Sequence, residues 1–105
     1  MKTIIQVSEV LHEGAITGRH SGRVIREQLV HACHAGDTVQ IDFAGVDFIT
    51  QSAADEFIGR IVRQHPAIIA QISFSNCATD VANMLQWAAE HADAVNQTER
   101  ELVPA

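Results

Sequence analysis

The residues best able to do chemistry stand together at Thr50, Gln51 and Ser52, where an apolar strand pattern gives way to a helical one. In α/β proteins, ligands and modifications gather where a strand ends and a helix begins, because free backbone N–H groups there favour negative charge. Ser52 is predicted to be the helix N-cap, with Asp55 three residues later completing a capping box. Ser52 is therefore a candidate for phosphorylation, although capping alone also explains it.

Four acidic side chains surround this junction: Asp42, Asp47, Asp55 and Glu56. Together they could ligate a divalent cation. Acids at a strand end and in a first helical turn are also what helix electrostatics favours, and we prefer that interpretation.

Arginines recur at helical spacing at Arg19, Arg23 and Arg26. Guanidinium groups bind phosphates and carboxylates through two hydrogen bonds, so Arg19 and Arg23 are candidates for anion binding. The alternative, which we favour, is an exposed helix face with an ion pair between Arg23 and Glu27.

A metal site or a catalytic centre is not expected. His31, Cys33 and His34 lie close in sequence, but no second pair of ligands follows at zinc spacing. Neither a nucleophile–histidine motif nor a glycine-rich phosphate loop is present, so we expect no enzyme and no cofactor. Trp87 lies at the margin of an apolar helix stripe and is either an edge of the core or a contact for a partner.

Composition narrows the class of protein further. The net charge is −6, which disfavours binding to nucleic acid or to an anionic membrane surface. The sequence contains neither a secretory signal nor an apolar run long enough to cross a bilayer. We expect a cytoplasmic protein in which Cys33 and Cys77 are buried thiols.

Hydrophobic periodicity predicts one α/β domain over residues 1–95, followed by a polar tail over 96–105. We expect a mostly parallel four-stranded sheet with helices packed on it. Strands are predicted at 3–7, 15–17, 39–43 and 67–74, the first two as an edge hairpin and the last inside the sheet. Helices are predicted at 21–35, 52–64 and 79–92, the first ending at Gly36 and the second before Pro66.

The run Ile-Asp-Phe-Ala-Gly-Val-Asp-Phe-Ile-Thr-Gln-Ser-Ala-Ala-Asp-Glu-Phe, residues 41–57, resembles STAS-like domains of the DUF4325 type. The resemblance extends to Gly22-Arg23 and to Ile-Ser-Phe-Ser-Asn at 72–76, and covers residues 17–92. It implies a STAS-like fold and says little about biochemistry.

More distantly, the chain resembles STAS domains of anti-sigma factor antagonists, whose Asp-Ser-Ser/Thr-Gly motif is phosphorylated at a helix start by a partner kinase. Thr50 occupies the place of the Asp, Ser52 falls on the phosphorylated position, and Ala53 replaces the glycine. The resemblance implies a protein partner, for which a histidine-kinase-like ATPase is a candidate.

The leading hypothesis is a non-enzymatic regulatory module that binds another protein and is switched by phosphorylation of Ser52. The candidate contact residues are Asp47, Thr50, Gln51, Asp55, Glu56, Arg60 and Arg63. The alternative is a sensor for a small ligand or nucleotide that uses the strand-end crevice with Arg19 and Arg23. The sequence leaves a homodimer open.

Overall fold

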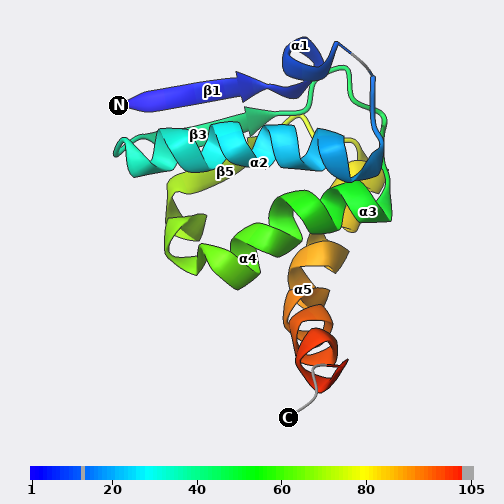
Figure 1. The fold of residues 1–105 in the computed structure, drawn as a ribbon. Helices are drawn as coiled ribbons and strands as arrows, with labels where there is room; N and C mark the ends of the chain where they lie inside the picture. The colour runs from blue at the N-terminus through cyan, green and yellow to red at the C-terminus, as the bar shows by residue number, and fades with distance from the viewer. Residues whose placement is uncertain (13, 103–105) are drawn as a thin grey trace.

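In the computed structural model, a parallel sheet carries helices on one face (Figure 1). The structure describes residues 1–12 and 14–102, and the side chains of these residues as far as Ala92. The elements in chain order are β1 (Lys2–Gln6), α1 (Val7–Leu11), β2 (Ala15–Ile16), α2 (Gly18–His34), β3 (Thr38–Asp42), β4 (Phe48–Ile49), α3 (Gln51–Ala54), the π-helical turn η1 (Asp55–Gly59), α4 (Arg60–Gln64), the 3-10 segment η2 (Pro66–Gln71), β5 (Ile72–Ser75) and α5 (Thr79–Leu102).

The main sheet has three parallel strands in the order β1–β3–β5, and β2 pairs with β4 in a separate parallel pair. The class, an α/β domain with parallel strands, is as predicted, but the single four-stranded sheet is wrong. The expected hairpin between the first two strands is also wrong. The helical turn α1 separates them, and β2 meets β4 instead.

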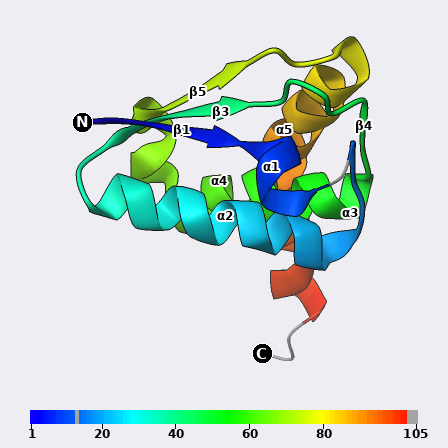
Figure 2. The same cartoon turned by 90° about the horizontal axis from the view of Figure 1, so that it is seen from above.

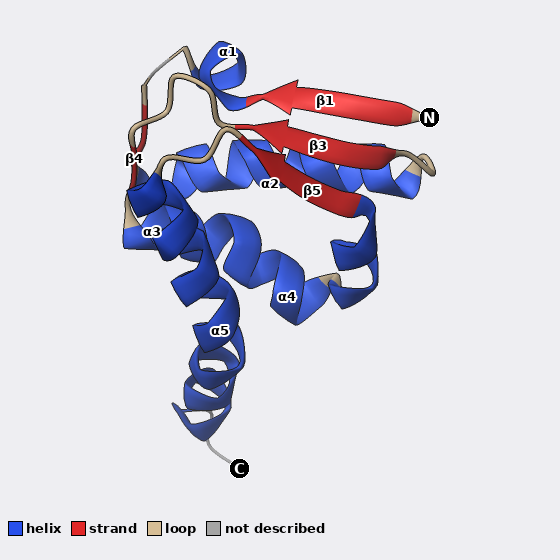
Figure 3. Ribbon diagram, turned by 180° about the vertical axis from the view of Figure 1, so that it is seen from behind, coloured by secondary structure: helices blue, strands red, loops and turns tan. Residues whose placement is uncertain are grey.

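In the described part of the chain, helices cover one face of the main sheet, whose strands lie side by side in the order β1–β3–β5 (Figure 3). Seen from above, α2 and α4 lie on the same side of the three strands (Figure 2). The register places Ile5, Ile41 and Phe74 in one row and Ile4, Gln40 and Ser73 in the next. Ile5 and Ile41 are buried, whereas Ile4 is 54% exposed. Alternating side chains thus separate a core face from a mainly polar open face.

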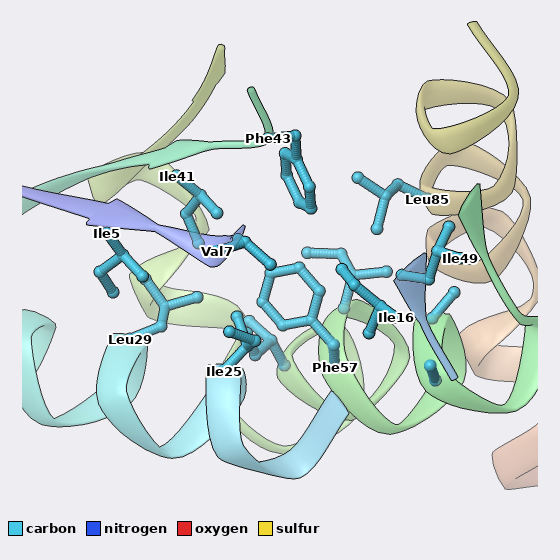
Figure 4. Close-up of a cluster of buried hydrophobic side chains, with 14 of the residues drawn as sticks. Ile5, Val7, Ile16, Ile25, Leu29, Ile41, Phe43, Ile49, Phe57 and Leu85 are labelled. Carbon is cyan, nitrogen blue, oxygen red and sulfur yellow. The ribbon is translucent and has the colours of Figure 1, made fainter. Parts of the chain in front are cut away.

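The core lies between this sheet and the helices (Figure 4). The helical stripe predicted for residues 21–35 is confirmed, since α2 buries Ile25, Leu29 and Cys33. Phe57 points from η1 into the same core, and both it and the buried Phe43 lie against Phe74. Burial of such large side chains supplies the main driving force for a domain of this size.

Two of the predicted helices begin or end close to where the pattern placed them. Residues Gln51 to Gln64 are continuously helical through α3, η1 and α4, and this helix stops before Pro66 as expected. The last helix, α5, begins at Thr79 as predicted. Its backbone continues to Leu102, into the segment expected to be a tail, and residues 103–105 lie outside the described residues.

The strand predicted over residues 67–74 is largely wrong. Pro66 begins the 3-10 segment η2, and only Ile72–Ser75 form a strand, which is an edge strand rather than an interior one. Apolar side chains on both faces suggested an interior strand, but Ile69 is 40% exposed. A short apolar run does not distinguish a strand from a helical turn by periodicity alone.

Candidate functional site

The hydroxyl of Thr50, rather than that of Ser52, caps the helix that begins at Gln51. Thr50 has an extended backbone, and its Oγ1 accepts a hydrogen bond of 3.2 Å from the N–H of Ala53. The predicted N-cap at Ser52 and its capping box with Asp55 are therefore wrong. Ser52 lies in the first turn instead, half-buried, with its Oγ 3.3 Å from Thr50 Oγ1.

Thr50 also joins two helix starts that are far apart in the sequence. Its Oγ1 accepts a second hydrogen bond of 3.2 Å from the N–H of Gly18, the first residue of α2. Its own N–H donates to the carbonyl of Ile16 at 2.9 Å, beyond the end of the β2–β4 pair. One threonine thus fixes the amino end of α3 against the amino end of α2.

Asp55 is held by arginines from two different helices. Its Oδ1 accepts from Arg63 at 2.8 Å, and its Oδ2 accepts from Arg19 at 3.0 Å. Burial on its own raises the pKa of Asp55, but hydrogen bonds from Arg63 and then Arg19 outweigh burial and hold the pKa below its usual range. Asp55 is therefore an ionised carboxylate that already has its partners.

Glu56 is the most heavily paired side chain of the site and is only 8% exposed. Its carboxylate accepts from Arg26 at 3.1 Å, Arg19 at 3.1 Å and Arg60 at 3.3 Å. Burial alone raises its pKa, but the hydrogen bond from Arg26 and the nearby charge of Arg60 lower it below the usual range. Four arginines and two acids thus form one network that ties α2 to η1 and α4.

Four of the seven predicted contact residues belong to this network. Asp55, Glu56, Arg60 and Arg63 face one another instead of presenting free charges to solvent. Arg19, a candidate for anion binding, is already engaged by both carboxylates. Pairs of this kind hold elements in register more than they attract outside partners.

The remaining predicted residues are more accessible. Asp47 and Gln51 are exposed, and Arg23 is exposed with its Nη2 3.1 Å from His20 Nδ1. The expected ion pair between Arg23 and Glu27 is absent from the described part of the chain.

Two adjoining hollows lie beside Ser52, and we call them together the Trp87 groove. The smaller, about 320 Å³, is lined by Arg19, Gln51, Ser52, Asp55 and Trp87. The larger, about 480 Å³, is lined by Phe48, Ile49, Gln51, Asp80, Asn83, Met84 and Trp87. Gln51 and Trp87 line both, so the two hollows adjoin at these residues, between α3 and α5.

The groove presents aromatic surface to solvent. Phe48 is 50% exposed, and the indole of Trp87 stacks on His91 with ring centres 4.4 Å apart and planes 18° apart. The sequence analysis did not identify Phe48 as a candidate contact residue. For Trp87 it weighed a partner contact against a core edge, and the only available signal was its place at the margin of the α5 stripe.

Among the side chains that the structure describes, no group of three or more His, Cys, Asp or Glu could hold a metal ion. Asp42, one of the acids considered for a cation, instead accepts hydrogen bonds of 2.9 Å from Asn76 and from the N–H of Ala44. Of the helices described, none is long and apolar enough to span a bilayer.

The family model described as a STAS-like domain of unknown function (DUF4325) matches residues 21–82, more than half of the 105 residues. The matched segment includes most of α2, the whole Gln51–Gln64 helix and the first turn of α5. No curated protein and no solved structure matches the chain.

Proposed function

Because this chain belongs to the family of STAS-like domains of unknown function (DUF4325), we propose that it is a non-enzymatic regulatory module that binds another protein through the Trp87 groove. A histidine-kinase-like ATPase in the cytoplasm is the class of partner that we propose. The family match does not define a biochemical role, and the support for this proposal comes from the exposed surface of the groove.

The observation that carries this proposal is the exposed aromatic surface at the junction of α3 and α5. Phe48 is half exposed, and Trp87 lines both hollows beside Gln51 and Ser52. Aromatic side chains with polar neighbours are the usual anchors of protein interfaces, because they bury a large area at little cost in side-chain entropy.

The network of arginines and acids supports a binding role rather than catalysis. The ionisable groups nearest Ser52 neutralise one another: Asp55 is held by Arg63, and Glu56 by Arg26. A general acid or base needs a pKa near neutrality, whereas the pKa values of both carboxylates are lowered. The network therefore gives the groove a rigid support.

Ser52 is the residue through which we propose that binding is regulated. It lines the groove and lies in the first turn of a helix of 14 residues, Gln51 to Gln64, where phosphate oxygens could meet backbone N–H groups. Phosphorylation would add about two negative charges beside Asp55. The added charge and bulk would weaken a fit that accommodates only a hydroxyl.

Site-specific photo-crosslinking tests the binding role. A photoreactive amino acid replaces Phe48 in the groove or, as the control, Ser73 on the open face of the sheet. We expect one protein to be captured from the native cells only through position 48. That protein, once identified and purified, should bind the wild-type chain and lose about tenfold or more in affinity for Trp87→Ala. Equal capture from both positions would contradict the proposal.

Intact-mass analysis tests the regulatory part. The chain is incubated with the captured partner and ATP, and we expect a gain of one phosphate that disappears in Ser52→Ala but persists in Thr50→Ser. A gain that survives in Ser52→Ala would reject Ser52 as the switch while leaving the binding role intact. A nucleotide sensor built on Arg19 and Arg23 has less support, because Arg19 is already engaged.

A further inference from the structure

We infer that the Trp87 groove receives an arginine or lysine side chain of the partner protein, with an apolar residue beside it. This inference rests on the proposed binding function and names the chemistry of the partner. It follows from three properties of the groove: surplus negative charge, oriented aromatic faces, and an apolar wall bordered by amide groups.

The negative charge comes from Asp80, in the first turn of α5. Asp80 lines the larger hollow, is exposed, and forms no ion pair with any residue that the structure describes. Arg19 is the only basic residue among those lining the two hollows, and Asp55 and Glu56 already hold it. The groove therefore carries a carboxylate without a cation of its own.

The aromatic rings of Trp87 and Phe48 are also suited to binding a cationic group. One face of the Trp87 indole is covered by His91, whose Nδ1 lies 2.8 Å from the Trp87 carbonyl oxygen. This stacking orients the ring that lines the groove, and Phe48 exposes half of its surface nearby. A cation over an aromatic face is attracted by the negative electrostatic potential that the ring quadrupole creates there, most strongly over tryptophan.

The remaining lining of the larger hollow suits both the methylene chain and the charged group of an arginine or lysine side chain. Met84 and Ile49 provide apolar wall for methylene groups, which arginine and lysine pack along apolar surface. Gln51 and Asn83 place amide groups on the same lining. An amide oxygen can accept from a guanidinium or ammonium group, which carries donors only. An acidic or purely apolar segment would leave Asp80 unsatisfied.

A peptide selection read out by fluorescence tests this inference without the natural partner. Random peptides are displayed against the immobilised chain, and binders that Trp87→Ala still retains are discarded. Trp87 is the only tryptophan in the sequence, so its emission reports on the groove directly. We expect the enriched peptides to carry arginine or lysine next to an apolar residue and to change this emission.

The charge contribution is measured with matched variants. Asp80→Asn should weaken binding of the selected peptides about two- to fivefold, and added salt should reduce the difference. Glu27→Gln, which changes the net charge equally but on the remote part of α2, should leave the affinity unchanged. Replacing the peptide arginine by neutral citrulline should have the same effect as Asp80→Asn.

The outcomes separate the two proposals. Enriched peptides that lack basic residues, or that bind Asp80→Asn and Glu27→Gln equally well, would overturn the cation site and leave the groove as a binding surface. If the selection enriches no peptide whose binding requires Trp87, the cation site is overturned, and the result also argues against the groove as a binding surface. Peptides that bind only through their free amino terminus would also overturn the inference, because the inference assigns the cation to an arginine or lysine side chain.

Discussion

Arg26 joins α2 to η1 through Glu56 by two hydrogen bonds from the same nitrogen. Its Nη1 donates to the main-chain carbonyl of Glu56 at 2.7 Å and to the Glu56 carboxylate at 3.1 Å. The two residues are 30 positions apart in the sequence. This contact lies at the centre of the network that supports the Trp87 groove, so its loss should affect the stability of the fold.

Removal of the Glu56 carboxylate should destabilise the fold strongly. Glu56→Ala leaves Arg26 and Arg60 without their shared acid, and the loss should be about 2–3 kcal/mol in the free energy of unfolding. Urea denaturation followed by circular dichroism measures it. Glu27→Ala, at an exposed position of α2, is the control and should change stability by less than about 0.5 kcal/mol. Equal effects would show that the network contributes little.

Stability should fall in acid because of the same carboxylates. The pKa values of Asp55 and Glu56 are lowered in the folded state, so the unfolded chain binds more protons near pH 4. Their contribution is complete above the unfolded-state values of about 4 and is lost as the pH falls through the folded-state values. Urea midpoints across this range measure the slope.

The variant Asp55→Asn/Glu56→Gln should show a flatter dependence on pH. Some slope should remain, because hydrogen bonds from Asn76 and Ala44 also lower the pKa of Asp42. An unchanged slope in the double variant would mean that other groups govern the acid transition.

The two hydroxyls at the helix start should differ in their effect on stability. Thr50→Val removes the acceptor for the N–H groups of both Ala53 and Gly18, and it should cost about 1–2 kcal/mol. Thr50→Ser retains the hydroxyl and should be milder. Ser52→Ala should be nearly neutral, since the Ser52 hydroxyl contacts only Thr50 among the described hydrogen bonds. Thermal unfolding ranks the three, and a larger cost for Ser52→Ala would restore Ser52 as the cap.

Gly22 should tolerate no side chain. A Cβ at this position would lie 2.4 Å from the carbonyl oxygen of Ala53, so α2 and α3 would have to separate. Gly22→Ala should therefore cost about 1–3 kcal/mol, although alanine is normally the better helix former. Gln28→Ala, at an exposed position of the same helix, is the control and should be close to neutral. Stabilisation by Gly22→Ala would contradict the close packing.

Local features of the chain could be predicted because they depend on neighbouring residues. The stripe of Ile25, Leu29 and Cys33 indicated α2, the alternation in 39–43 indicated β3, and Pro66 indicated the end of the preceding helix. The prediction of a strand at 67–74 was wrong because its apolar residues fit a 3-10 turn equally well. The prediction of one four-stranded sheet was wrong in part because strand pairing depends on contacts between distant segments.

The sequence by itself determined where the candidate site lies, at the start of the helix that follows β4, and which ionisable residues are near it. The tertiary structure decided what those residues do. It made Thr50 the cap by bringing Gly18 to its hydroxyl, and it paired Glu56 with arginines up to 37 residues away. It also placed Trp87 beside Gln51, because α5 packs against α3. Helix periodicity can be read from residues close together in the sequence, whereas contacts between distant segments form only when the elements pack.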